Sequence, residues 1–63
     1  MKERIVKRER CYGMDGITFR DKDGILDTFF PVISDKGFGV VSVTVLHKIS
    51  DLKNMGYKIT FDF

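Results

Sequence analysis

A chain of 63 residues with a net charge of +2 has room for one small domain, and none of its apolar runs is long enough to span a membrane. The hydrophobic content of 43% and charged content of 32% are typical of a soluble globular protein, so we predict a single domain over residues 1–63. The single cysteine, Cys11, excludes an intrachain disulfide, and the lack of an apolar signal-peptide core favours a cytoplasmic protein. A domain this short buries only about 60% of its unfolded surface, so association is expected to add stability.

Positive charge is concentrated at the start of the chain. Residues 1–10 carry five basic and two acidic side chains, whereas residues 11–63 carry six basic and seven acidic ones. The basic residues of this segment are Lys2, Arg4, Lys7, Arg8 and Arg10. Such a segment is typical either of an edge strand that charges protect from aggregation or of a surface for an anionic partner.

The first half of the chain predicts strands joined by tight turns. The strands are Ile5–Tyr12, Ile17–Arg20 and Ile25–Ile33, and the turns are Gly13–Gly16 and Asp21–Gly24. The alternation in the first strand is poor, which favours an edge position. The hairpin from Ile17 to Phe30 is the clearest local feature. Pro31 lacks an N–H group and therefore marks an edge, a bulge or a strand end.

The second half is organised around the stretch from Asp35 to His47. A loop over Ser34–Gly39 leads into an uninterrupted run of β-forming residues, Val40–Leu46, which we predict to be the central strand. Ser50–Met55 then has the N-cap and the apolar spacing of a short helical turn that ends at Gly56. Tyr57–Phe63 alternates strictly and predicts a half-buried last strand.

These elements predict a mainly β fold. Five strands with short turns and one helical turn favour a small antiparallel barrel or curled sheet of the OB or SH3-like kind. The alternative is an α+β fold in which an open antiparallel sheet carries one helix across one face.

Nothing in the composition predicts catalysis, a metal or another cofactor. His47 is the only histidine and Cys11 the only thiol, and they are far apart in sequence. A structural zinc site needs four ligands, which this pair does not supply within one chain. We interpret His47 as a partly buried residue at the end of the central strand. The acidic turn near Asp21 lacks the glycine and glutamate spacing of a calcium loop.

One stretch, Lys36–Val43, is similar to the RNP1 pattern of RNA-binding domains. Glycines let a strand approach a nucleic acid, an aromatic side chain stacks on bases, and lysine meets phosphate. Lys36 and Phe38 retain this pattern, whereas Val40 and Val43 replace its other aromatic positions.

The same residues resemble the first nucleic-acid motif of the cold-shock domain, an OB-fold family that binds single-stranded DNA and RNA. Over the whole chain, the first, second and third strands of that family resemble Ile5–Lys7, Gly16–Thr18 and Asp27–Ile33, and its last two resemble Val40–Leu46 and Tyr57–Phe63. The resemblance implies a five-stranded barrel and a single-stranded nucleic acid as partner. The family's second motif is absent from this sequence.

Two functions follow as hypotheses. The first is a small non-enzymatic module that acts by protein–protein interaction or self-association, as an accessory or inhibitor protein, and its size also fits a gene of a mobile element. The alternative is an OB-like module for single-stranded nucleic acid. The candidate binding residues for either partner are Lys2, Arg4, Lys7, Arg8, Arg10, Tyr12, Phe29, Lys36 and Phe38.

Overall fold

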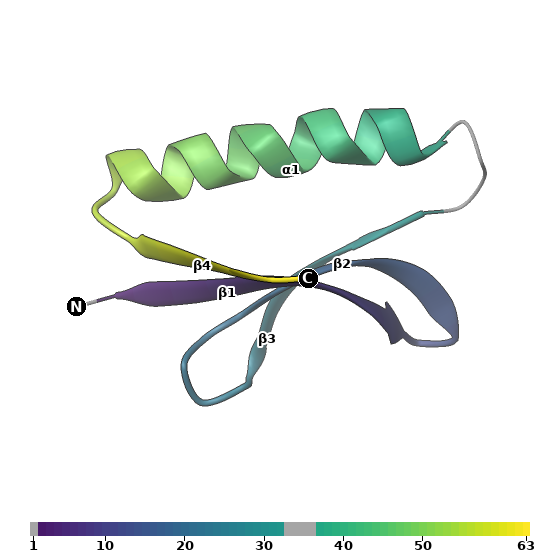
Figure 1. Cartoon of the computed structure of the whole chain (residues 1–63), viewed down its shortest axis with the longest axis horizontal. Coiled ribbons are helices and arrows are strands. Elements are labelled where there is room, and N and C mark those ends of the chain that lie inside the picture. The colour runs from purple at the N-terminus through teal and green to yellow at the C-terminus, as the bar shows by residue number, and fades with distance from the viewer. Residues whose placement is uncertain (1, 33–36) are drawn as a thin grey trace.

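The computed structural model describes residues 2–32 and 37–63, and it describes side chains for residues 2–32 and 43–63. Within these residues the chain forms four strands and one helix. They are β1 (Glu3–Cys11), β2 (Met14–Arg20), β3 (Leu26–Pro31), α1 (Gly37–Asn54) and β4 (Lys58–Asp62). The strands make one sheet in the order β3-β2-β1-β4, and α1 runs along one face of it (Figure 1).

The sheet is mixed and open. β1, β2 and β3 are antiparallel neighbours, whereas β4 runs parallel to β1. A parallel neighbour requires a long crossover, and α1 supplies it by leading from β3 at one edge to β4 at the other (Figure 1). The described strands therefore do not close into the predicted five-stranded barrel. The alternative architecture, an open sheet with one helix across one face, fits, except that β4 joins in parallel.

The sequence had suggested that the basic first strand lies at an edge of the sheet, and this prediction is wrong. β1 is an interior strand, with β2 on one side and β4 on the other. Its charged side chains are accommodated because the other strands contribute carboxylates, as the ion pairs of Arg4, Lys7 and Arg8 show. The edges are β3 and β4, and Pro31 ends β3, in agreement with its missing N–H group.

Turn chemistry places the hairpins. Ile17 and Phe30 are directly paired, which confirms the predicted hairpin. In its turn, the carboxylate of Asp21 accepts hydrogen bonds from the N–H groups of Asp23 and Ile25, each at 2.9 Å. The first turn is displaced from the predicted Gly13–Gly16. It consists of Tyr12 and Gly13, both with positive φ (54° and 77°), as a two-residue hairpin loop requires.

The predicted central strand Val40–Leu46 is wrong, because these residues belong to α1. Val45, Ile49 and Leu52 recur at spacings of four and three, and all three are buried against the sheet. Burial of this face outweighs the β-propensity of the valines. The predicted end at Gly56 is confirmed, since Gly56 has a φ of 90° and the N–H of Tyr57 donates to the carbonyl of Leu52 at 3.0 Å.

The core lies between α1 and one face of the sheet. Val6, Ile17 and Phe19 from the strands meet the helix face described above, and Phe30, Tyr57 and Ile59 pack around them. Phe19 and Phe30 make an edge-to-face contact with ring centroids 5.7 Å apart. This core is small, as expected for a chain of this length.

Candidate protein-interaction site

The predicted basic residues of β1 do not form one surface. Directly paired residues share a face of a sheet, and successive residues alternate between faces. Val6 points into the core, so Arg4, Arg8 and Arg10 lie on the face that carries α1. Lys7 lies on the open face, together with its β4 neighbour Asp62.

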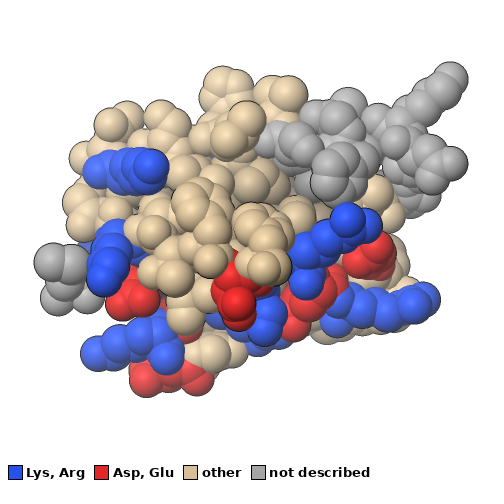
Figure 2. All heavy atoms as spheres, viewed as in Figure 1, with Lys and Arg blue, Asp and Glu red and all other residues tan. Residues whose placement is uncertain are grey.

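Intramolecular partners occupy most of these cations. Arg8 pairs with Asp15 at 3.1 Å, Lys7 with Asp62 at 4.0 Å, and Arg4 with Asp27 at 3.5 Å. The two remaining basic residues, Arg10 and Lys2, also have local contacts. Arg10 donates to the carbonyl of Gly13, and Lys2 and Arg4 lie over the ring of Tyr57. Figure 2 shows Lys and Arg interspersed with Asp and Glu over the sheet side of this view, rather than gathered in one basic patch.

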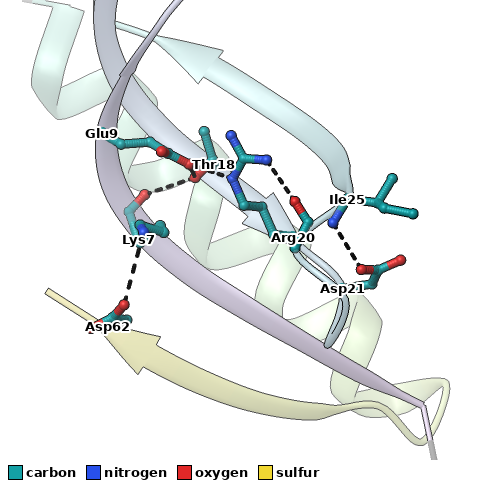
Figure 3. A network of polar contacts seen from close by, with 8 residues as sticks. Lys7, Glu9, Thr18, Arg20, Asp21, Ile25 and Asp62 are labelled. Atoms are coloured by element: carbon teal, nitrogen blue, oxygen red, sulfur yellow. Dashed lines mark hydrogen bonds and ion pairs between the residues drawn. The ribbon is translucent and has the colours of Figure 1, made fainter.

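A polar network crosses the open face of the sheet (Figure 3). The carboxylate of Glu9 accepts hydrogen bonds from the Arg20 guanidinium at 2.6 Å and from the Thr18 hydroxyl at 2.5 Å. These bonds lower the pKa of Glu9, with the Arg20 contact as the largest cause. Arg20 also donates to the carbonyl of Gly24. The network ties β1 to β2 and to the following turn, which makes it a structural feature of the sheet.

Tyr12 and Phe29 come together, as an aromatic site would require. Their ring centroids are 6.2 Å apart, and Tyr12 is 79% exposed at the tip of the first hairpin. Phe29 lies across Gly16, where a Cβ atom would approach its ring to 2.6 Å. Phe29 therefore has a packing role, and of these two rings only that of Tyr12 is largely exposed.

The remaining two predicted site residues are not placed as side chains. Lys36 lies outside the described residues, and so does the side chain of Phe38. The backbone of Gly37–Gly39 begins α1. The interpretation of this stretch as an RNP1-like strand platform is therefore wrong, because stacking in that motif takes place on the surface of a strand.

The structure places the candidate reactive residues on separate elements. Cys11 ends β1 and is partly buried, whereas His47 is exposed on α1 rather than at the end of a strand. Among the described residues, no group of three His, Cys, Asp or Glu side chains could hold a metal ion. No helix in the described part of the chain combines the length and hydropathy needed to cross a membrane.

An apolar groove lies between α1 and the β4 side of the sheet. It has a volume of about 340 Å³ and is lined by Arg8, Ile17, Val45, Leu46, Ile49, Phe61 and Phe63. Phe61 and Phe63 are stacked with centroids 6.1 Å apart, yet they are 53% and 76% exposed. On the helix, Leu46 is 65% exposed and Val43 is exposed one turn before it. The candidate residues named from sequence include only Arg8 from this surface.

The free edge of β4 borders the groove. The N–H of Lys58 donates to the carbonyl of Lys2 at 2.9 Å, so the backbone groups of Lys58 face β1. Since direction alternates along a strand, the N–H and C=O groups of Ile59 and Phe61 face away from β1. In the described sheet β4 has a neighbour only on the β1 side. Exposed aromatic rings and open backbone groups thus adjoin each other, and the alternation of Tyr57–Phe63 was the sequence feature that pointed to them.

The fold and this surface define a small α+β domain with one open sheet face and one apolar groove at a free edge. No family model, curated protein or solved structure matches the chain.

Proposed function

We propose that this protein is a small non-enzymatic module that acts by binding another polypeptide, as accessory and inhibitor proteins do. The observation that carries the proposal is the exposed apolar surface formed by Leu46, Phe61 and Phe63, which line one groove beside the free edge of β4. Contiguous apolar surface on a small domain is typical of an interaction site, and exposed aromatic side chains are common hot spots.

The backbone edge adds a second mode of recognition. A polypeptide that pairs with β4 gains main-chain hydrogen bonds, while its side chains contact the groove. An Arg8–Asp15 ion pair lies at the rim, since Arg8 also lines the groove. A rim charge of this kind contributes more to the specificity and rate of association than to affinity.

The alternative, binding of single-stranded nucleic acid, has less support. Its basic residues are divided between two faces of β1, and Arg4, Lys7 and Arg8 already pair with carboxylates. A site that follows a phosphate backbone needs cations gathered in one groove. Fluorescence anisotropy with labelled oligonucleotides at low salt tests it, and tight binding with a steep salt dependence would favour this alternative.

Site-specific photocrosslinking in cells of the natural host tests the proposed function. A benzophenone amino acid replaces Phe63 at the groove, and in a matched control it replaces Lys22, which is exposed in the β2–β3 turn. We expect discrete protein adducts from position 63 that position 22 does not give. Equal adduct patterns from both positions, or none from position 63, would refute the proposal.

A further inference from the structure

We propose that the polypeptide bound at this site is a second copy of the same chain, joined by antiparallel pairing of β4 with β4 about a two-fold axis at Thr60. This inference rests on the proposed function and names its partner. The sequence from Tyr57 to Phe63 is chemically symmetric about its centre, so the strand is complementary to itself when it is read in the opposite direction.

The pairs in this register are all favourable ones. Lys58 lies opposite Asp62 of the second copy, and Asp62 lies opposite the second Lys58. Thr60 faces Thr60, and Ile59 faces Phe61. Opposite charges, Thr–Thr pairs and aromatic–aliphatic pairs are the combinations that stabilise neighbouring antiparallel strands. The charge complementarity is repeated by symmetry, so each dimer gains two ion pairs.

The backbone of β4 has the phase that this pairing requires. The N–H and C=O groups of Ile59 and Phe61 face the free edge, so these two residues form the hydrogen-bonded pairs, with about four bonds between the chains. Thr60 and the Lys58–Asp62 pairs then occupy the non-hydrogen-bonded positions, where opposing side chains approach most closely. A register shifted by one residue would point the ladder groups of one copy away from the other.

The charges of β4 are available for this contact. In the described residues Lys58 forms no ion pair, and Asp62 is 69% exposed with a single ion-pair partner, Lys7, whose Nζ lies 4.0 Å away. The other edge of the sheet is less suited to pairing. β3 ends at Pro31 and has an irregular register opposite Phe19 and Arg20, and both features discourage strand addition.

The two-fold axis also places the apolar surfaces together. Pairing about an axis perpendicular to the sheet extends the four described strands into a continuous sheet of eight, with both α1 helices on the same face. Phe61 and Ile59 point toward that face, since Phe61 pairs directly with the core residue Val6, and Leu46 of α1 lines the same groove as Phe61 and Phe63. The dimer would therefore cover the groove that a single copy leaves open.

Charge reversal tests the register directly. Lys58→Glu places two acidic pairs across the interface and Asp62→Lys places two basic pairs, so each variant alone is expected to dimerise at least roughly tenfold more weakly than the wild type. An equimolar mixture of the two variants restores opposite charges at both pairs and is expected to form a heterodimer. Sedimentation velocity gives the oligomeric state, native mass spectrometry identifies the heterodimer, and circular dichroism confirms that each variant is folded.

A cysteine crosslink provides a second test in a Cys11→Ser background. Thr60→Cys brings the new thiols of the two copies within reach of a disulfide, and mild oxidation is expected to give a covalent dimer. Asp62→Cys is the matched control. The two introduced thiols lie four residues apart along the paired strands, or about 13 Å, so this variant is expected to run as a monomer in non-reducing denaturing electrophoresis.

Three results would overturn the inference. They are a wild-type chain that stays monomeric at all concentrations, a dimer that single charge reversals do not weaken, and equal crosslinking at positions 60 and 62. If the wild type is monomeric but a crosslinker at Phe63 captures a different protein, the proposed function stands and the second copy is the wrong partner. If position 63 gives only adducts of the chain with itself, both proposals are supported.

Discussion

Substitution of Gly16 by alanine is expected to destabilise the sheet strongly. Gly16 lies within β2, between Glu9 of β1 and Pro31 of β3. A Cβ atom at this position would lie 2.6 Å and 2.9 Å from two ring carbons of Phe29, and still closer to the carbonyl oxygen of Phe30. The ring could move, but the carbonyl belongs to the β2–β3 ladder, so the two strands themselves would have to shift.

The expected cost is about 2–3 kcal/mol, at the upper end of the range for overpacking because backbone must move. A domain of this size has a total stability of about 3–9 kcal/mol, so the loss is a large part of it. The melting temperature should fall by about 10–20 °C, as followed by circular dichroism at one fixed protein concentration.

Two further variants identify the cause. Gly24→Ala places a Cβ in open space at a positive φ, so it reports only the backbone cost of about 1 kcal/mol. In a Phe29→Ala background the ring contact is gone, and Gly16→Ala should cost less there than in the wild type, as a double-mutant cycle measures. A melting temperature of Gly16→Ala within about 2 °C of the wild type would refute the steric argument.

Three other substitutions test the polar network, the helix and the core. Because the pKa of Glu9 is lowered in the folded state, its carboxylate stabilises the fold at pH values above its usual pKa of 4.5, and this stability is lost as the pH falls through the folded-state pKa. Glu9→Gln removes the carboxylate that Arg20 holds, so the melting temperature of this variant should fall less between neutral and acidic pH than that of the wild type. Val43→Ala should raise the free energy of unfolding by about 0.5 kcal/mol, because Val43 is exposed on α1 and alanine has the higher helix propensity. A lower free energy of unfolding in urea titrations would indicate a strand at this position instead. Leu52→Ala should cost about 2–5 kcal/mol and largely unfold the chain, while Met55→Ala, at an exposed position, should leave the circular dichroism spectrum unchanged.

Local chemistry explains which elements could be predicted. The turn at Asp21–Gly24 depends on an Asp carboxylate and a glycine that are adjacent in sequence, and the hairpin around it was predicted with the correct pairing. The end of α1 likewise depends on a local feature, the positive φ of Gly56 and the capping bond from Tyr57 to Leu52. Both features are settled by residues that lie within a few positions of one another, so neighbouring sequence was sufficient.

The helix could not be predicted from propensity, because the competing energies come from distant residues. The four valines between positions 40 and 45 cost a helix about 0.6 kcal/mol each relative to alanine, or about 2.5 kcal/mol together. Burial of Val45, Ile49 and Leu52 against the sheet returns about 1.5–3 kcal/mol for each side chain. The second sum is larger, but it exists only once the three antiparallel strands have formed a surface.

The site was missed for the same reason. The alternation of Tyr57–Phe63 predicted that its aromatic residues share a face, and they do, because Phe61 pairs directly with the core residue Val6. Whether Phe61 and Phe63 are covered depends on how far α1 extends over the sheet. The sequence had suggested a short turn instead of this helix, so the groove between α1 and β4 could not be foreseen.

The interior position of the basic strand explains why the binding surface lies where it does. Charges on an interior strand can be matched from both sides, and β2, β3 and β4 supply Asp15, Asp27 and Asp62 to the arginines and lysine of β1. In the described part of the chain Lys58 forms no ion pair, and because β4 has a neighbour only on the β1 side, its outward backbone groups keep their hydrogen-bonding capacity. Partner binding at that edge would add apolar burial to a small core and stabilise the folded state by mass action, which couples the association of this protein to its folding.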